Sequence, residues 1–174
     1  MTLLVVGSVA YDSVSTAAGT RDDALGGSAT YFSVSSSFFT KVNVVAVIGD
    51  DFLESDKKKL LDYKIDISNL STESGNTFRW KGVYDTSDVN IRETLDTQLN
   101  VFENFNPILS NSNKQSDYLF LANIAPDLQM KTLTQMSKRP KIVALDTMNF
   151  WIDDHKKDLT SIIEKVDILF MDNK

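Results

Sequence analysis

The sequence predicts an α/β sandwich, in which a parallel sheet lies between two layers of helices. Five near-continuous apolar runs of strand length occur along the chain, and segments with helical patterns separate several of them. Such runs are typical of strands that are covered on both faces. Alternation of strands with helices favours right-handed crossovers between parallel strands.

The apolar runs place the expected strands at residues 3–6, 42–48, 118–121, 141–145 and 166–170. The helical patterns place helices at residues 30–39, 52–63, 126–138 and about 154–165. The first helix is rich in serine, a weak helix former, so it needs tertiary packing, and its small side chains allow close packing on the sheet. Pro126 suits the first turn of the third helix. Residues 104–116 are expected to form an exposed polar loop.

Residues 76–99 do not fit this alternation. Large apolar residues stand there among polar ones, which is typical of antiparallel strands with one solvent-facing side. With residues 11–16, this stretch would form a small second sheet that projects from the main one. An edge hairpin and a functional cover are equally compatible with the residues alone.

Composition limits the class of protein. A length of 174 residues favours one domain, and no apolar run approaches the ~20 residues of a membrane span. The net charge of −6 argues against nucleic acid or an anionic membrane as the main partner. The chain has no cysteine and a single histidine, so disulfides and thiolate metal sites are excluded and a histidine metal site has little support. We expect a cytoplasmic protein.

A glycine pair, Gly26 and Gly27, stands directly before a run that can open a helix. Glycine has no Cβ, so the backbone can approach a ligand closely. The amides of Ser28, Ala29 and Thr30 would then be free donors at a helix N-terminus. The plainer interpretation is that the pair is only a loop.

Asp12 follows the first expected strand and a short turn. An ionised carboxylate at this place can accept hydrogen bonds from the hydroxyl groups of a ligand. Asp is also common in turns for purely local reasons, so a structural role is the alternative.

These segments, taken in order with the strand that ends in Gly49-Asp50-Asp51, resemble the N-terminal half of the ribokinase-like (pfkB) carbohydrate kinases, a family that includes nucleoside kinases. The resemblance implies a Rossmann-like, ribokinase-like three-layer α/β/α sandwich with a small β-sheet lid over the sugar site. The lid segments would be about residues 11–24 and 76–99. Residues 1–174 would be the N-terminal part of a single domain, with its C-terminal part missing.

The resemblance also implies the residues that bind the substrate. Asp12, Gly26 and Gly27 would line the sugar pocket. Thr30 lies near the place where many members carry Asn, which leaves the identity of the sugar open. Asn123 follows the strand at 118–121 and would touch the substrate from a neighbouring strand end.

The phosphate side is implied by two further matches. Asp146 opens a run, Asp-Thr-Met-Asn, that is similar to the Asp-Pro-Asn segment of the family, although an N-cap is the alternative. Asn173 matches the first residue of an Asn-x-x-Glu motif that organises Mg²⁺, and the Glu is not in the sequence. Arg79 and Arg92 in the lid could approach a phosphate, but solvated arginines are the first interpretation.

The implied activity is ATP- and Mg²⁺-dependent phosphorylation of a hydroxymethyl group of a sugar or nucleoside. The Gly-Ala-Gly-Asp run that supplies the catalytic base of the family does not occur among the 174 residues, so we assign no catalytic residue and no metal ligand. The chain alone is therefore expected to be inactive. A non-catalytic sugar- or nucleoside-binding module is the alternative function. The apolar residues of the lid would mediate a homodimer or close on substrate, unless they fold back as core.

Overall fold

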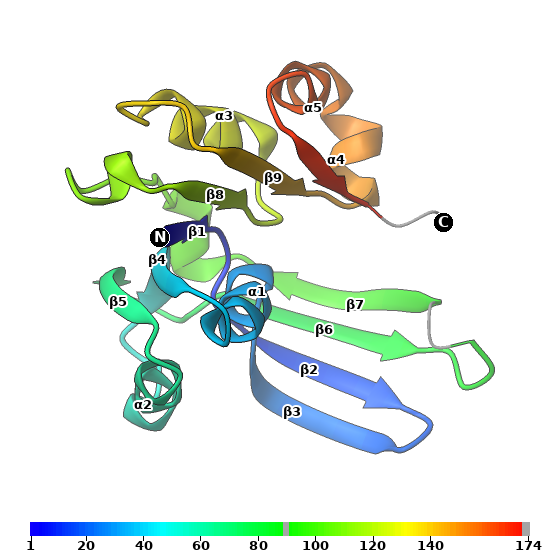
Figure 1. Cartoon of the computed structure of the whole chain (residues 1–174). Coiled ribbons are helices and arrows are strands. Elements are labelled where there is room, and N and C mark those ends of the chain that lie inside the picture. The colour runs from blue at the N-terminus through cyan, green and yellow to red at the C-terminus, as the bar shows by residue number, and fades with distance from the viewer. Residues whose placement is uncertain (89–90, 172–174) are drawn as a thin grey trace.

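The computed structural model describes residues 1–88 and 91–171. In this part of the chain, the centre is a parallel sheet of six strands in the spatial order β10-β9-β8-β1-β4-β5 (Figure 1). On the central strand, Val5 lies opposite Val44 on one side and Phe120 on the other. The strands are β1 (Thr2–Val6), β4 (Lys41–Gly49), β5 (Asp66–Glu73), β8 (Tyr118–Leu121), β9 (Ile142–Asp146) and β10 (Ile168–Phe170).

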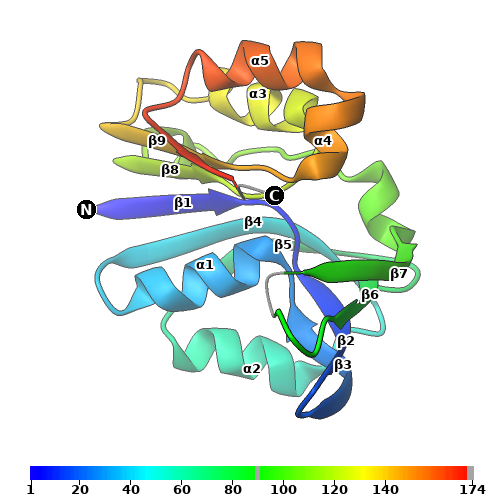
Figure 2. The ribbon, with the colours of Figure 1, turned by 90° about the vertical axis from the view of Figure 1, so that its right-hand side faces the viewer.

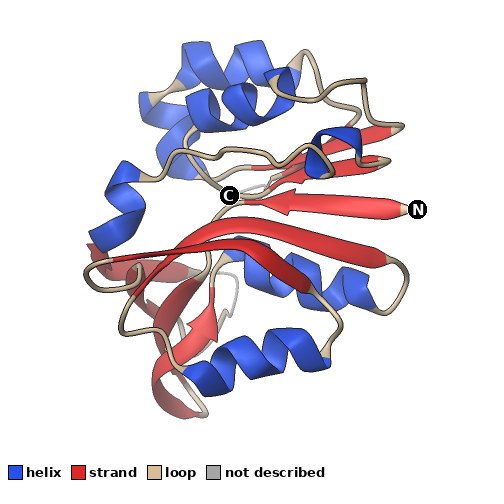
Figure 3. Ribbon diagram, turned by 90° about the vertical axis from the view of Figure 1, so that its left-hand side faces the viewer, coloured by secondary structure: helices blue, strands red, loops and turns tan. Residues whose placement is uncertain are grey.

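Helices lie on both faces of this sheet, so the fold has three layers (Figures 2 and 3). One hydrophobic core includes Val5 and Leu60 and lies beneath α1 and α2; the other includes Val6 and Ile162 and lies beneath α3 and α5. Among the described residues, no helix has the length and apolarity needed to span a bilayer. The helices are α1 (Ser28–Ser37), α2 (Glu54–Asp62), α3 (Pro126–Thr134), α4 (Asn149–Asp154) and α5 (Lys156–Ile163), with 3₁₀ turns η1 (Asn100–Asn104) and η2 (Asn113–Gln115).

A second sheet projects from the carboxyl ends of the main strands (Figure 1). We call it the lid; its strands are β2 (Ala10–Thr16), β3 (Gly19–Gly26), β6 (Arg79–Tyr84) and β7 (Arg92–Gln98). Their spatial order is β3-β2-β6-β7, with β2 and β6 parallel and the outer pairs antiparallel. The predicted fold class, an α/β sandwich with a small second sheet, is confirmed.

Three local expectations differ from the structure. Strand β5 was not among the expected strands, because its sequence is mostly polar and it lies at the edge of the sheet. The helix expected at about 154–165 is interrupted at His155, which has a non-helical backbone. The loop at 104–116 is not simply exposed: Phe105 and Leu109 are buried in the core beneath α3 and α5, and Asn113 accepts a 3.0 Å hydrogen bond from the Asn43 amide.

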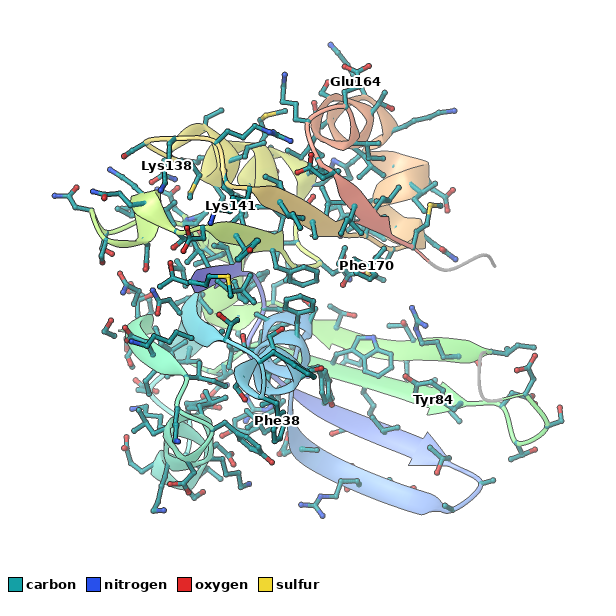
Figure 4. All side chains as sticks on the ribbon, viewed as in Figure 1. Phe38, Tyr84, Lys138, Lys141, Glu164 and Phe170 are labelled. Atoms are coloured by element: carbon teal, nitrogen blue, oxygen red, sulfur yellow. The ribbon has the colours of Figure 1, made fainter. Side chains whose placement is uncertain are left out.

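The helical layer that contains α1 stops short of one edge of the sheet. Helix α1 packs against β4 and β1, and its Phe32 ring stacks on Phe120 of β8. Beyond this contact, Ile142, Ile168 and Phe170 remain 40%, 42% and 46% exposed on the outer strands. Phe170 lies on the sheet face that α1 borders (Figure 4). An open apolar groove therefore runs along β8, β9 and β10 beside α1.

Candidate functional site

The candidate site begins where the lid leaves the main sheet. Ser8 follows β1 and is buried at the start of α1. Its Oγ accepts a 3.2 Å hydrogen bond from the Ser28 amide, and its carbonyl accepts a 3.0 Å bond from the Ala29 amide. Two of the three amides that were expected to face a ligand are therefore satisfied by Ser8. The helix N-terminus is tied to the β1–β2 turn, which corrects that expectation.

The backbone at Gly26 and Gly27 lies too close to neighbouring residues to carry a side chain. Gly27 has φ +91° and ψ 145°, a region that is essentially restricted to glycine. A Cβ at Gly27 would collide with the carbonyl of Ser8, and one at Gly26 would collide with the carboxylate of Asp12. The glycine pair thus allows the end of β3 to lie directly against the β1–β2 turn and Asp12.

Asp12 lies on β2 beside this junction. Its Oδ2 accepts a 3.3 Å hydrogen bond from the Gly27 amide. Burial raises the pKa of the Asp12 carboxyl, and the Gly27 amide offsets only part of that rise. A carboxylate offers about four lone-pair sites, and the described residues fill one of them with a long bond. Asp12 is thus a partly desolvated acceptor with capacity for further donors.

Thr30 and Tyr31, neighbours on α1, differ in how far their side chains are exposed. Thr30 is only 3% exposed, and its hydroxyl has no hydrogen-bond partner among the described residues. Tyr31 is 59% exposed, and partial burial together with the nearby Asp12 and Tyr84 raises the pKa of its phenol. Tyr31 is therefore the exposed side chain close to Asp12. A ligand role for Thr30 stays a prediction.

A second group of polar residues lies at the carboxyl ends of β8 and β9. Burial raises the pKa of Asp146, while the backbone amides of Thr147 and Asn123 and the charge of Arg92 on the lid strand β7 lower it. The side-chain carbonyl of Asn123 accepts a 2.9 Å bond from the Trp151 indole. The fold thus brings Asn123 and Asp146 together, and the charge of Arg92 on the lid is near enough to lower the pKa of Asp146. Asn173 lies outside the described residues.

Gln129 holds these two strand ends in register. Its amide nitrogen lies 2.9 Å from the Ala122 carbonyl and 3.0 Å from the Asp146 carbonyl, and the side chain is fully buried. A buried amide with two such acceptors fixes the separation of the strand ends. Asn123, next to Ala122, is positioned relative to Asp146 by this contact.

Arg79 takes part in a group of ion pairs that joins the lid to the main sheet. Its guanidinium pairs with Asp51 at 2.7 Å and with Asp23 at 3.3 Å. Asp51 also accepts 2.7 Å bonds from the amide and the hydroxyl of Thr77. Burial alone would raise the pKa of Asp51, but the bonds from Thr77 and Arg79 outweigh it and lower the pKa. Arg79 is thus half-buried and engaged by two carboxylates, rather than free to meet a phosphate.

The described residues do not provide a metal site. No group of three or more His, Cys, Asp or Glu side chains in residues 1–88 and 91–171 is arranged to hold an ion. Asp146 contributes a single carboxylate at its strand end.

Three features of the candidate site were not expected from the sequence. The sequence does not point to Ser8, although a Gly-Ser pair directly after a strand is a weak signal for a close turn. Tyr31 was passed over in favour of Thr30, because sequence spacing does not say which face of the helix is buried. The approach of Arg92 to Asp146 depends on the angle between the two sheets, which no local pattern encodes.

Replacement of Gly27 by Ala should destabilise the protein more than the same change at Gly19. Both glycines have positive φ, so each substitution should cost about 1–3 kcal/mol in backbone strain. A Cβ at Gly19 meets open space, whereas one at Gly27 also collides with Ser8. The free energy of unfolding from urea denaturation measures the difference. Equal losses for the two variants would show that the junction is not closely packed.

The fold of this chain is also found in proteins of known structure. No family model matches the sequence, and no curated protein matches it. Solved structures do match. A Methanocaldococcus jannaschii nucleoside kinase, described as an archaeal member of the ribokinase family, superposes with a TM-score of 0.72 at 18% identity, over 99% of this chain and 60% of its own.

Two further matches are a fructokinase and a nucleoside kinase. The Vibrio cholerae O395 fructokinase, with fructose, ADP and calcium bound, gives a TM-score of 0.70 at 11% identity, over 98% of this chain and 59% of its own. The Burkholderia thailandensis nucleoside kinase in complex with inosine gives 0.64 at 9% identity, over 97% and 68%. The chain spans about 60% of the length of the first of these structures. The 174 residues thus have the ribokinase-like fold shared by carbohydrate and nucleoside kinases.

Proposed function

We propose that the chain is the acceptor-binding part of an ATP-dependent kinase that phosphorylates a hydroxymethyl group of a sugar or nucleoside. The observation that carries this proposal is the Asp12 carboxylate at the lid junction, with one long hydrogen bond from Gly27 and unused acceptor capacity. The structural neighbours include sugar and nucleoside kinases, and the fold is the same. We further propose that the protein acts in the cytoplasm.

Asp12 would bind the hydroxyls of the acceptor. Hydroxyl donors on a partly desolvated carboxylate form charge-assisted hydrogen bonds, which are stronger than neutral ones. Gly26 has no side chain, so the Asp12 carboxylate can lie directly against the end of β3. The exposed phenol of Tyr31 would complete the pocket on the helix side.

Asn123, Asp146 and Asn173 would face the phosphate side. ATP, when bound with Mg²⁺, supplies the phosphoryl group and its charge neutralisation. Phosphoryl transfer depends on positioning and on stabilisation of charge. The Gly-Ala-Gly-Asp run that supplies the catalytic base of the family does not occur among the 174 residues. The charge of Arg92 on the lid strand β7 lowers the pKa of Asp146, so Arg92 would lie on the phosphate side.

The uncovered groove supports the view that further polypeptide completes the fold. Ile142, Ile168 and Phe170 form a half-exposed apolar strip where one helical layer stops. Monomeric proteins rarely leave a contiguous strip of this kind in solvent. We propose that the strip is covered in the active enzyme.

A homodimer through the lid is part of the same proposal. Phe78 stacks on Phe102 and so folds back onto the main domain. Ile91 and Leu95, by contrast, are more than half exposed on the lid. They are the residues that a second subunit would cover.

Substitution of Asp12 by Ala should weaken binding of the acceptor by about 1.5–3 kcal/mol, the usual contribution of hydrogen bonds to a charged group. Isothermal titration calorimetry with ribose, fructose and inosine measures the affinity. Asp22→Ala, an exposed acid on the neighbouring strand β3, is the matched control and should leave the affinity unchanged. If Asp12→Ala binds every ligand as tightly as the unmodified chain, Asp12 is only a turn residue.

The 174-residue chain alone should show no phosphoryl transfer to ribose, fructose or inosine with Mg-ATP. Positioned acid–base and anion-binding groups contribute orders of magnitude to a rate, and the described residues do not provide them. A coupled assay for ADP on protein free of contaminating kinase measures turnover. Turnover that Asp12→Ala abolishes would contradict the expectation that the chain is inactive by itself. Binding without turnover in a completed protein would favour the non-catalytic module.

A further inference from the structure

One face of the lid carries aromatic side chains beside Asp12. Strands β2 and β6 run parallel, with Asp12 opposite Trp80 and Val14 opposite Gly82. Alternate residues of a strand point to the same face, so Trp80, Gly82 and Tyr84 share the face of Asp12. Figure 4 shows Tyr84 on β6 in the lid. The carboxylate and the indole thus occupy neighbouring strands on one surface.

The indole of Trp80 is held in a fixed position on this face. Its Nε1 donates a 3.2 Å hydrogen bond to the hydroxyl of Thr94 on β7. A Cβ at Gly82 would collide with Cη2 and Cζ2 of the indole, so the ring fills the space above Gly82. A glycine at this position is what allows the ring to lie against the strand. A ring that is already ordered loses little freedom when a ligand packs on it.

Trp80 takes no part in either hydrophobic core of the described residues. Phe78, two residues earlier on the chain, stacks on Phe102 at 5.4 Å, whereas none of the ring–ring contacts in the described part of the chain involves Trp80. The indole is half-buried, and Trp80 lies opposite Asp12 on the neighbouring strand of the same lid face. A large ring that packs on no core and adjoins a polar site is suited to contact a ligand.

We infer that Trp80 is a stacking platform for a planar heterocycle, and that the acceptor is a nucleoside rather than a free sugar. The inference rests on the proposed function, because Asp12 must hold the ribose hydroxyls while the base lies on the neighbouring strand. Tyr31, exposed near Asp12 and Tyr84, adds a second aromatic side chain. Stacking accepts any base, since each base has a π face, so the choice of base is left to other contacts.

The test compares inosine with ribose on the unmodified chain, Trp80→Leu and Trp80→Phe by isothermal titration calorimetry. Inosine should bind more tightly than ribose to the unmodified chain. Trp80→Leu should weaken binding of inosine about 5- to 150-fold, the range for loss of one base–aromatic stack, and leave binding of ribose within about twofold. Trp80→Phe, which keeps a π face, should recover part of the loss. Lys81→Ala, on the opposite face of the same strand, is the control and should change neither affinity.

Gly82→Ala gives a second, independent variant. This variant keeps the indole but displaces it, so it should selectively weaken the binding of inosine. It therefore tests the inference even if circular dichroism shows that Trp80→Leu does not fold. If ribose binds through Asp12 and inosine gains nothing from Trp80, the nucleoside inference is overturned and the proposed function stands. If neither ligand binds the unmodified chain, the proposed function fails and this inference fails with it.

Discussion

The contact between Gly27 and Ser8 is the constraint on which the rest of the site depends. The main sheet continues into the lid at Ser8, and the lid returns to the main domain at Gly27. Because Gly27 has no Cβ and a positive φ, the two crossing points can touch, and Ser8 can accept the first amides of α1. The same close approach places Asp12 against Gly26. A Cβ at either glycine would collide with Asp12 or Ser8, so a bulkier residue would force the lid away from this contact.

A second attachment fixes the base of the lid. Asp51, just beyond the end of β4, binds Thr77 and Arg79 at the start of β6. These bonds are partly shielded from solvent, and hydrogen bonds to charged groups contribute about 1.5–3 kcal/mol each. The pKa of Asp51 is lowered in the folded protein, so this stabilisation is fully present above the ordinary Asp pKa. It is lost as the pH falls below that value and through the pKa of the folded protein. Tyr11 adds a buried bridge, donating to Asp56 and accepting from the Leu53 amide.

The parts of the fold that depend on burial could be predicted from the sequence. Strands such as β4 and β8 are apolar because both of their faces are covered, and that pattern is local. Strand β5 was not predicted, since an edge strand needs few apolar side chains. In the site, the glycine pair could be identified, because close backbone approach requires glycine itself. The burial of Thr30, the exposure of Tyr31 and the approach of Arg92 to Asp146 depend on how a helix and two sheets are oriented. Those orientations arise from contacts between distant residues.

The central claim is that the Asp12 carboxylate accepts hydrogen bonds from the hydroxyls of the acceptor. The most direct test is an NMR titration of the ¹³C-labelled Asp12 carboxyl, carried out without ligand and with saturating inosine or ribose. In the free chain, burial should hold the pKa of Asp12 above its ordinary value. Bound hydroxyl donors favour the ionised form, so the account predicts that ligand lowers this pKa. A titration curve that stays the same while the ligand is demonstrably bound would contradict the claim.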